Sequence, residues 1–175
     1  MGIGIGGVAG YTAAIFHIFA HAVTKAMLFL TTPRLAEVSG DSLLFKELQG
    51  SGLRDRDAGV FFTISAFSMI GIPIFAGFAA KLQFGLAAVE DGAGWRLILV
   101  FLALAVSSML NALYFVRTII RIYSRPNEST RMEVRPHHRA GYNVPMLVLT
   151  VMNLFLGLFS WVTVDLIHRG PMLFS

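Results

Sequence analysis

The fold of this chain is decided by one long apolar stretch, Val8-Ala-Gly-Tyr-Thr-Ala-Ala-Ile-Phe-His17-Ile-Phe-Ala-His21-Ala-Val-Thr-Lys25-Ala-Met-Leu-Phe-Leu30. A helix needs about 20 predominantly apolar residues to cross a bilayer, and this stretch is long enough. A lysine at the bilayer centre costs roughly 2.5–3.5 kcal/mol, so such residues usually face a bundle interior or a water-filled path. His17, His21 and Lys25 therefore indicate a functional site inside a membrane protein.

Composition points to the same class. Hydrophobic residues make up 55% of the chain and charged residues only 14%, so we expect an all-α integral membrane protein. Because the chain has no cysteine, it cannot build a disulfide or a thiolate metal site. It also shows no nucleotide, flavin, quinone or iron–sulfur motif, so we expect no cofactor. The net charge of +4 reflects loop residues biased by membrane insertion, so we expect the lipid bilayer and no nucleic acid as a partner.

Four membrane spans can be drawn, at about 8–30, 59–89, 95–122 and 145–167, within a single membrane domain that covers residues 1–175 and forms part of a larger helix bundle. The first is expected to end before Thr31-Thr32-Pro33, because proline ends a helix. The second is long for one span and is interrupted at Gly71-Ile-Pro73, which predicts a broken helix.

The basic residues predict an orientation. An even number of spans places two basic regions on one side of the membrane, where they contribute ten residues: Arg34, Lys46, Arg54, Arg56, Arg117, Arg121, Arg125, Arg131, Arg135 and Arg139. Only Arg96 and Arg169 lie on the opposite side. Since positive charge concentrates on the cytoplasmic side, both termini are predicted to lie outside.

His17, His21 and Lys25 share one stripe, because eight residues of helix rise about 12 Å and turn only about 80° beyond two full turns. An imidazole donates at one nitrogen and accepts at the other, so it can pass a proton along a chain of waters. Two other interpretations remain: histidines at i and i+4 can bind a metal, and each can simply hydrogen-bond a neighbouring helix. No carboxylate is available in either charged span to complete a metal site, and Lys25 would repel one, so we expect no metal.

The interruption of the second span supplies a second candidate site. Broken helices occur at membrane depth mainly where the backbone lines a cavity or is shielded by protein. Gly71, Pro73 and Gly77 form the predicted hinge, and Lys81 follows on an apolar helix. A kink needed only for packing is the alternative, but it does not account for the lysine. Proton or cation conduction is therefore favoured.

At these residues the chain resembles the antiporter-like subunits shared by respiratory complex I, Mrp-type cation/proton antiporters and membrane-bound hydrogenases. The resemblance rests on Phe16-His17-x-x-x-His21-Ala-x-x-Lys25-Ala-x-Leu28-Phe-Leu and on Gly71-Ile-Pro73-Ile-Phe75-Ala-Gly77-Phe-x-x-Lys81. It implies that His17, His21, Lys25 and Lys81 belong to a hydrophilic axis that relays protons. Family members usually have a second proline where this chain has Ile74.

The resemblance also implies a partial subunit. Family members have about fourteen spans in two inverted repeats, so this chain resembles their C-terminal third. It predicts a proton-translocating, non-catalytic part of a complex I-like NADH:quinone oxidoreductase in a prokaryotic cytoplasmic membrane, assembled with other membrane subunits. The alternatives are an Mrp-type monovalent cation/proton antiporter subunit, for which sodium is a candidate cation, and a non-conducting scaffold.

Overall fold

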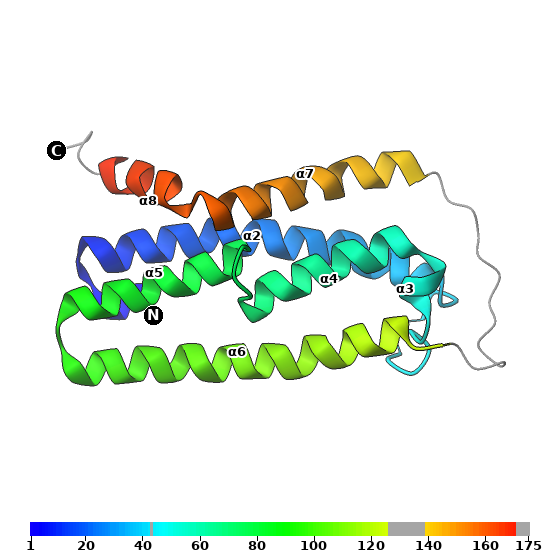
Figure 1. The fold of residues 1–175 in the computed structure, drawn as a ribbon, viewed down its shortest axis with the longest axis horizontal. Helices are drawn as coiled ribbons and strands as arrows, with labels where there is room; N and C mark the ends of the chain where they lie inside the picture. The colour runs from blue at the N-terminus through cyan, green and yellow to red at the C-terminus, as the bar shows by residue number, and fades with distance from the viewer. Residues whose placement is uncertain (43, 126–138, 171–175) are drawn as a thin grey trace.

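Helices make up almost all of the regular structure. The computed structural model describes residues 1–42, 44–125 and 139–170, and over these ranges it contains no strand. The predicted all-α class is confirmed (Figure 1). The bounds of the helices are α1 Gly2–Ile5, α2 Gly7–Glu37, α3 Ser51–Arg54, α4 Arg56–Ile70, α5 Ala76–Asp91, α6 Gly94–Tyr123, α7 Arg139–Leu158 and α8 Ser160–Arg169.

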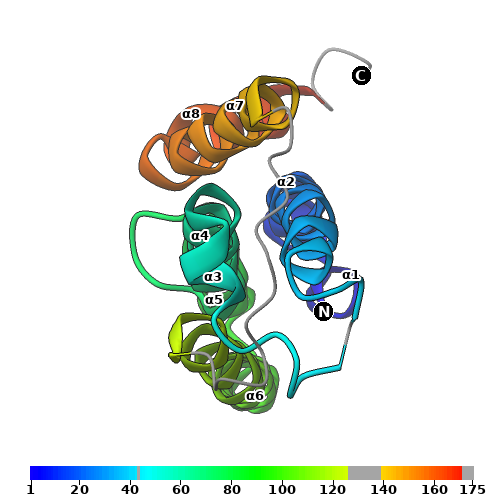
Figure 2. The ribbon, with the colours of Figure 1, turned by 90° about the vertical axis from the view of Figure 1, so that its right-hand side faces the viewer.

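The helices run back and forth along one long axis. Helix α2 crosses the whole length, α4 and α5 return end to end, α6 crosses again, and α7 and α8 return (Figure 1). In the view along that axis, α4 and α5 lie between α6 on one side and α7 and α8 on the other, with α2 beside them (Figure 2). The α4–α5 pair is therefore flanked by other helices on three sides (Figure 2).

Within residues 1–42, 44–125 and 139–170, three helices are long and apolar enough to span a membrane: α2, α6 and the part of α7 from Gly141 to Leu158. The second predicted span, residues 59–89, corresponds to α4 followed by α5, each of which is shorter than a full span. Helix α6 has large apolar side chains on the exterior of the helix bundle, and Ile98, Leu102 and Leu110 are among those exposed. Arg131 and Arg135, which count towards the predicted orientation, lie outside the described residues.

The predicted break in the second span is confirmed, since α4 ends at Ile70 and α5 begins at Ala76. Gly71 ends α4 in the left-handed conformation, with φ of 92°, and its N–H donates to the carbonyls of Phe67 and Ser68. Glycine adopts this conformation at little steric cost. Ile74 also has a positive φ, of 88°, which is unusual for a β-branched residue and costs about 1–3 kcal/mol.

Helix α2 continues through Pro33 to Glu37, so the expectation that proline ends this helix is wrong. Two neighbouring hydroxyls bond carbonyls of the preceding turn: Thr31 donates to Met27 and Leu28, and Thr32 donates to Leu28. Pro33 has no N–H to offer the carbonyl of Phe29, and these hydroxyl bonds hold the turn before it. Beyond it, a buried ion pair between Arg34 and Asp55 fixes the final turn of α2.

The last predicted span is two helices instead of one, because α7 ends at Leu158 and α8 begins at Ser160. The interruption at Phe159 lies between Gly157 and Ser160, and glycine and serine are residue types at which helices bend sharply.

The helices around the break pack closely because small residues line their interfaces. One buried cluster joins α2, α5 and α7 and consists of Phe16, Ala20, Val23, Ala76, Ala79, Ala80 and Leu156. Alanines let helix backbones approach one another, which is how membrane helices associate. This packing brings the candidate residues of α2 and α5 to opposite sides of one cavity.

Candidate functional site

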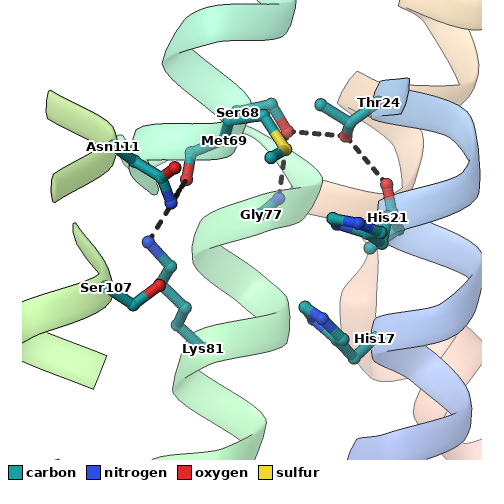
Figure 3. Close-up of a pocket in the computed structure, with 10 residues that line it drawn as sticks. His17, His21, Thr24, Ser68, Met69, Gly77, Lys81, Ser107 and Asn111 are labelled. Carbon is teal, nitrogen blue, oxygen red and sulfur yellow. Dashed lines mark hydrogen bonds between the residues drawn. The ribbon is translucent and has the colours of Figure 1, made fainter. Parts of the chain in front are cut away.

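A polar cavity of about 150 Å³ lies beside the break. This volume is several times the roughly 10–15 Å³ that one water molecule needs. Four helices, α2, α4, α5 and α6, contribute its lining (Figure 3): His17, Ala20, His21, Thr24, Ser68, Met69, Gly77, Lys81, Ser107 and Asn111. The structure therefore brings His17, His21 and Lys81, which were predicted from separate motifs, to one cavity large enough for several water molecules.

Lys81 binds the open end of α4. Its Nζ donates to the carbonyl of Ile70 at 2.6 Å, to the hydroxyl of Ser108 at 2.7 Å and to the carbonyl of Met69 at 3.3 Å. An ammonium has three hydrogens to donate, so these oxygens accommodate all three. The last carbonyls of a helix lack partners within the helix and carry partial negative charge. The break thus creates the binding site for the Lys81 side chain.

The two histidines lie one turn apart on α2 and stack, with ring centroids 5.3 Å apart. The ring of His17 also packs against Phe84 of α5, with centroids 5.4 Å apart. The Nδ1 atom of His17 is buried and has no hydrogen-bond partner among the described residues. Because a buried polar nitrogen without a partner is costly, this atom favours a water in the cavity that the ring lines.

Lys25 is separate from this arrangement. It lies on α2 one turn beyond His21, but its side chain is exposed and does not line the cavity. The rotation of about 80° between His17 and Lys25 accounts for this, because it turns Lys25 off the face that meets α5. A lysine exposed on an apolar helix needs a polar neighbour or water at membrane depth.

The hinge residues occupy distinct places in the break. Gly71 ends α4, Pro73 lies in the connection, and Gly77 lies in the first turn of α5. A Cβ at Gly77 would overlap the carbonyl oxygen of Ser68 and lie 2.7 Å from its carbonyl carbon. Only glycine therefore lets the start of α5 approach the end of α4 this closely.

Sequence reasoning missed the polar residues that complete the site. Asn111 of α6 donates to the carbonyl of Met69, beside Lys81. Asn153 of α7 is fully buried and bonds the hydroxyls of Thr24 and Ser68. The available signal was an amide side chain inside a run of apolar residues, which is costly in a membrane unless it has a partner.

These observations define a class: an integral membrane helix bundle with titratable side chains around a polar cavity at a broken helix, as in proteins that move ions across membranes. Residues 1–110 match the family described as "NADH:quinone oxidoreductase/Mrp antiporter, TM". The chain belongs to this family, which confirms the resemblance seen in its motifs.

Individual relatives come from both branches of the family. NADH-quinone oxidoreductase subunit N of Desulforudis audaxviator (strain MP104C) is 32% identical over 171 residues, which are 91% of this chain and 33% of that protein. Na(+)/H(+) antiporter subunit A1 of Staphylococcus haemolyticus (strain JCSC1435) is 30% identical over 163 residues, 87% of this chain and 20% of that protein. The chain thus spans a third or less of the length of these relatives.

Two solved structures share the fold. In the Mrp complex from Dietzia sp. DQ12-45-1b, the match has a TM-score of 0.75 and 24% identity and covers 95% of this chain and 38% of that one. In respiratory complex I from Thermus thermophilus with bound aureothin, it has a TM-score of 0.65 and 21% identity and covers 90% and 35%.

Proposed function

We propose that this chain is part of a subunit that translocates protons in a complex I-like membrane oxidoreductase. The observation that carries the proposal is the shared cavity, which His17 and His21 line from α2 and Lys81 lines from α5. Water in such a cavity connects imidazole nitrogens to an ammonium, and both groups take up and release protons. Redox chemistry would belong to partner subunits.

Proton movement through the cavity follows from the contacts of Lys81. While protonated, it donates to Ile70, Ser108 and Met69 at the end of α4. Release of a proton to the cavity leaves an amine with one donor fewer, so at least one of these bonds must be lost. The histidines are the titratable groups that line the cavity opposite Lys81, and His17 has a nitrogen available as the acceptor. Lys25, which is exposed, would continue the path only with residues from outside this chain.

Replacement of His17 by glutamine tests the proposal. Glutamine forms hydrogen bonds but does not exchange a proton near neutral pH. In the complete complex, His17→Gln should reduce proton pumping at least tenfold per assembled complex. His168→Gln is the matched control, since His168 is exposed on α8 and does not line the cavity. Equal pumping by the two variants would contradict the proposal, and so favour a scaffold.

An Mrp-type antiporter subunit is the second candidate. It is supported by the relative named as a Na(+)/H(+) antiporter subunit and by the match to the Mrp complex. The two candidates differ in energy source: pumping driven by NADH without sodium supports the first, whereas proton movement that requires a sodium gradient supports the second.

We also propose that the subunit lies in a prokaryotic cytoplasmic membrane with other membrane subunits, and that both termini face outside. The bacterial relatives support the membrane, and their names as subunits support the partners. The orientation rests on the basic residues between the spans.

A further inference from the structure

Asn153, in the second half of α7, is a buried amide with partners on three other helices. Its side chain is fully buried. Its Nδ2 donates to the hydroxyl of Thr24 on α2 at 2.9 Å and to that of Ser68 on α4 at 3.1 Å. Its Oδ1 accepts the backbone N–H of Ala76, the first residue of α5, at 3.3 Å. One amide therefore links α2, α4, α5 and α7 at the break.

The number of hydrogens available on each side chain fixes the direction of every hydrogen bond among Thr24, Ser68 and Asn153. The hydroxyl of Thr24 donates to the carbonyl of Ala20 at 2.8 Å, so in the 3.1 Å contact between the two hydroxyls Ser68 must be the donor. The oxygen of Ser68 then accepts from Asn153 and from the N–H of Gly77 at 3.1 Å. Each hydroxyl has one hydrogen and two lone pairs, and all are used. A closed network of this kind anchors the helices to one another.

The network holds the first turn of α5. The first four N–H groups of a helix lack partners within it. Here the N–H of Ala76 donates to Asn153 and the N–H of Gly77 donates to Ser68. The following two N–H groups, of residues 78 and 79, donate to the carbonyl of Phe75. Lys81 lies five residues after Ala76, which is about 7.5 Å along the helix. A shift of the first turn would therefore move Lys81 away from the carbonyls of α4.

Close packing keeps α7 in reach of the break. Gly157 lies one turn beyond Asn153, and a Cβ there would overlap the carbonyl oxygen of Ile74. Helix α7 thus rests directly on the backbone between α4 and α5. Asn153 itself does not line the cavity, so an effect on proton movement would have to act through the residues that it holds in place.

We propose that Asn153 is a positioning residue: it fixes the start of α5 against α2 and α4 and thereby sets where the Lys81 ammonium lies in the cavity. The inference rests on the proposed proton path, because it assigns Asn153 a role in placing a residue of that path.

The test compares Asn153→Leu, which has similar volume and no polar atoms, with Thr150→Val. Thr150 is the matched control because it is buried on the same helix and its hydroxyl donates to the carbonyl of Met146 within α7. Both variants are studied in the complete complex. Hydrogen exchange of a peptide covering residues 72–82 reports on the anchored amides, and proton pumping per assembled complex is measured over a range of pH.

Asn153→Leu should exchange faster over 72–82, pump about tenfold to a hundredfold more slowly and show a displaced pH profile, whereas Thr150→Val should match the wild type. Wild-type exchange in Asn153→Leu would overturn the anchoring, and faster exchange with an unchanged rate and pH profile would overturn the positioning role. If Asn153→Leu does not assemble, Ser68→Ala tests the same anchor, and unchanged exchange at Gly77 would overturn it. A failure of the proposed proton path can be told apart from a failure of the anchoring. If the proton path is wrong, His17→Gln pumps normally, and hydrogen exchange in Asn153→Leu still tests the anchoring by itself.

Discussion

The contact between α7 and the break makes a sharp prediction for Gly157→Ala. The added methyl would overlap the carbonyl oxygen of Ile74 and lie 2.6 Å from the carbonyl carbon of Phe75, whereas ordinary contacts begin at 3.4 Å. These neighbours are backbone atoms and cannot rotate away, so α7 must move off the break. That movement would stretch the 3.3 Å hydrogen bond between Ala76 and Asn153, one turn away.

Three contributions set the expected change in the free energy of unfolding of Gly157→Ala. Overpacking a tight interface costs about 1–3 kcal/mol, and loss of the bond to a buried N–H costs about 1–3 kcal/mol more. The helix propensity of alanine returns about 1 kcal/mol. Gly157→Ala should therefore lower the free energy of unfolding by about 1–5 kcal/mol.

Gly141→Ala is the matched control, because Gly141 lies on the same helix and a Cβ there would meet no atom within 4 Å. It should be neutral or stabilising by up to about 1 kcal/mol. The assay is reversible unfolding of the chain in mixed micelles, followed by the fluorescence of Trp95 and Trp161. Equal free energies of unfolding for the two alanine variants would refute the reasoning.

Two further predictions concern the ion pair at the end of α2 and the orientation of the chain in the membrane. Arg34 binds Asp55 through two hydrogen bonds of 2.8 Å with both side chains largely buried, so Asp55→Asn or Arg34→Met alone should destabilise the chain by about 3–5 kcal/mol. The double variant should lose less than the sum in the same unfolding assay, and strict additivity would contradict a coupled pair. Because the chain has no native cysteine, Glu47→Cys and Glu90→Cys at exposed positions report orientation directly. An impermeant thiol reagent added outside should label Glu90→Cys and not Glu47→Cys, and the reverse pattern would invert the proposed topology.

The sequence predicted the fold where local chemistry dominates. Apolar length predicts the spanning helices, and the interruption at Gly71 and Pro73 predicts the break, because both depend only on neighbouring residues. Beyond Pro33, the last turn of α2 is held by the ion pair between Arg34 and Asp55, which lies 21 residues away in the sequence. The proline alone therefore predicted the wrong final residue for α2.

The site was predictable in part for the same reason. Buried ionisable residues are conspicuous in an apolar sequence, so His17, His21 and Lys81 could be found. Which face of α2 meets α5 depends on the packing of Ala20 against Ala79 and Ala80, and the helical stripe alone could not show that Lys25 points elsewhere. The partners of Asn153 lie 77 to 129 residues away in the sequence, so only the structure identifies them.

The central claim is that Lys81 releases and regains a proton in the cavity between α2 and α5. It is tested most directly by proton pumping in inverted vesicles that contain the complete complex, normalised to the amount assembled, for Lys81→Met and Lys81→Arg. Methionine keeps most of the stem without a titratable group, and a guanidinium stays protonated, so pumping should fall sharply in both variants while assembly persists. Full pumping by the assembled Lys81→Met complex would contradict the account.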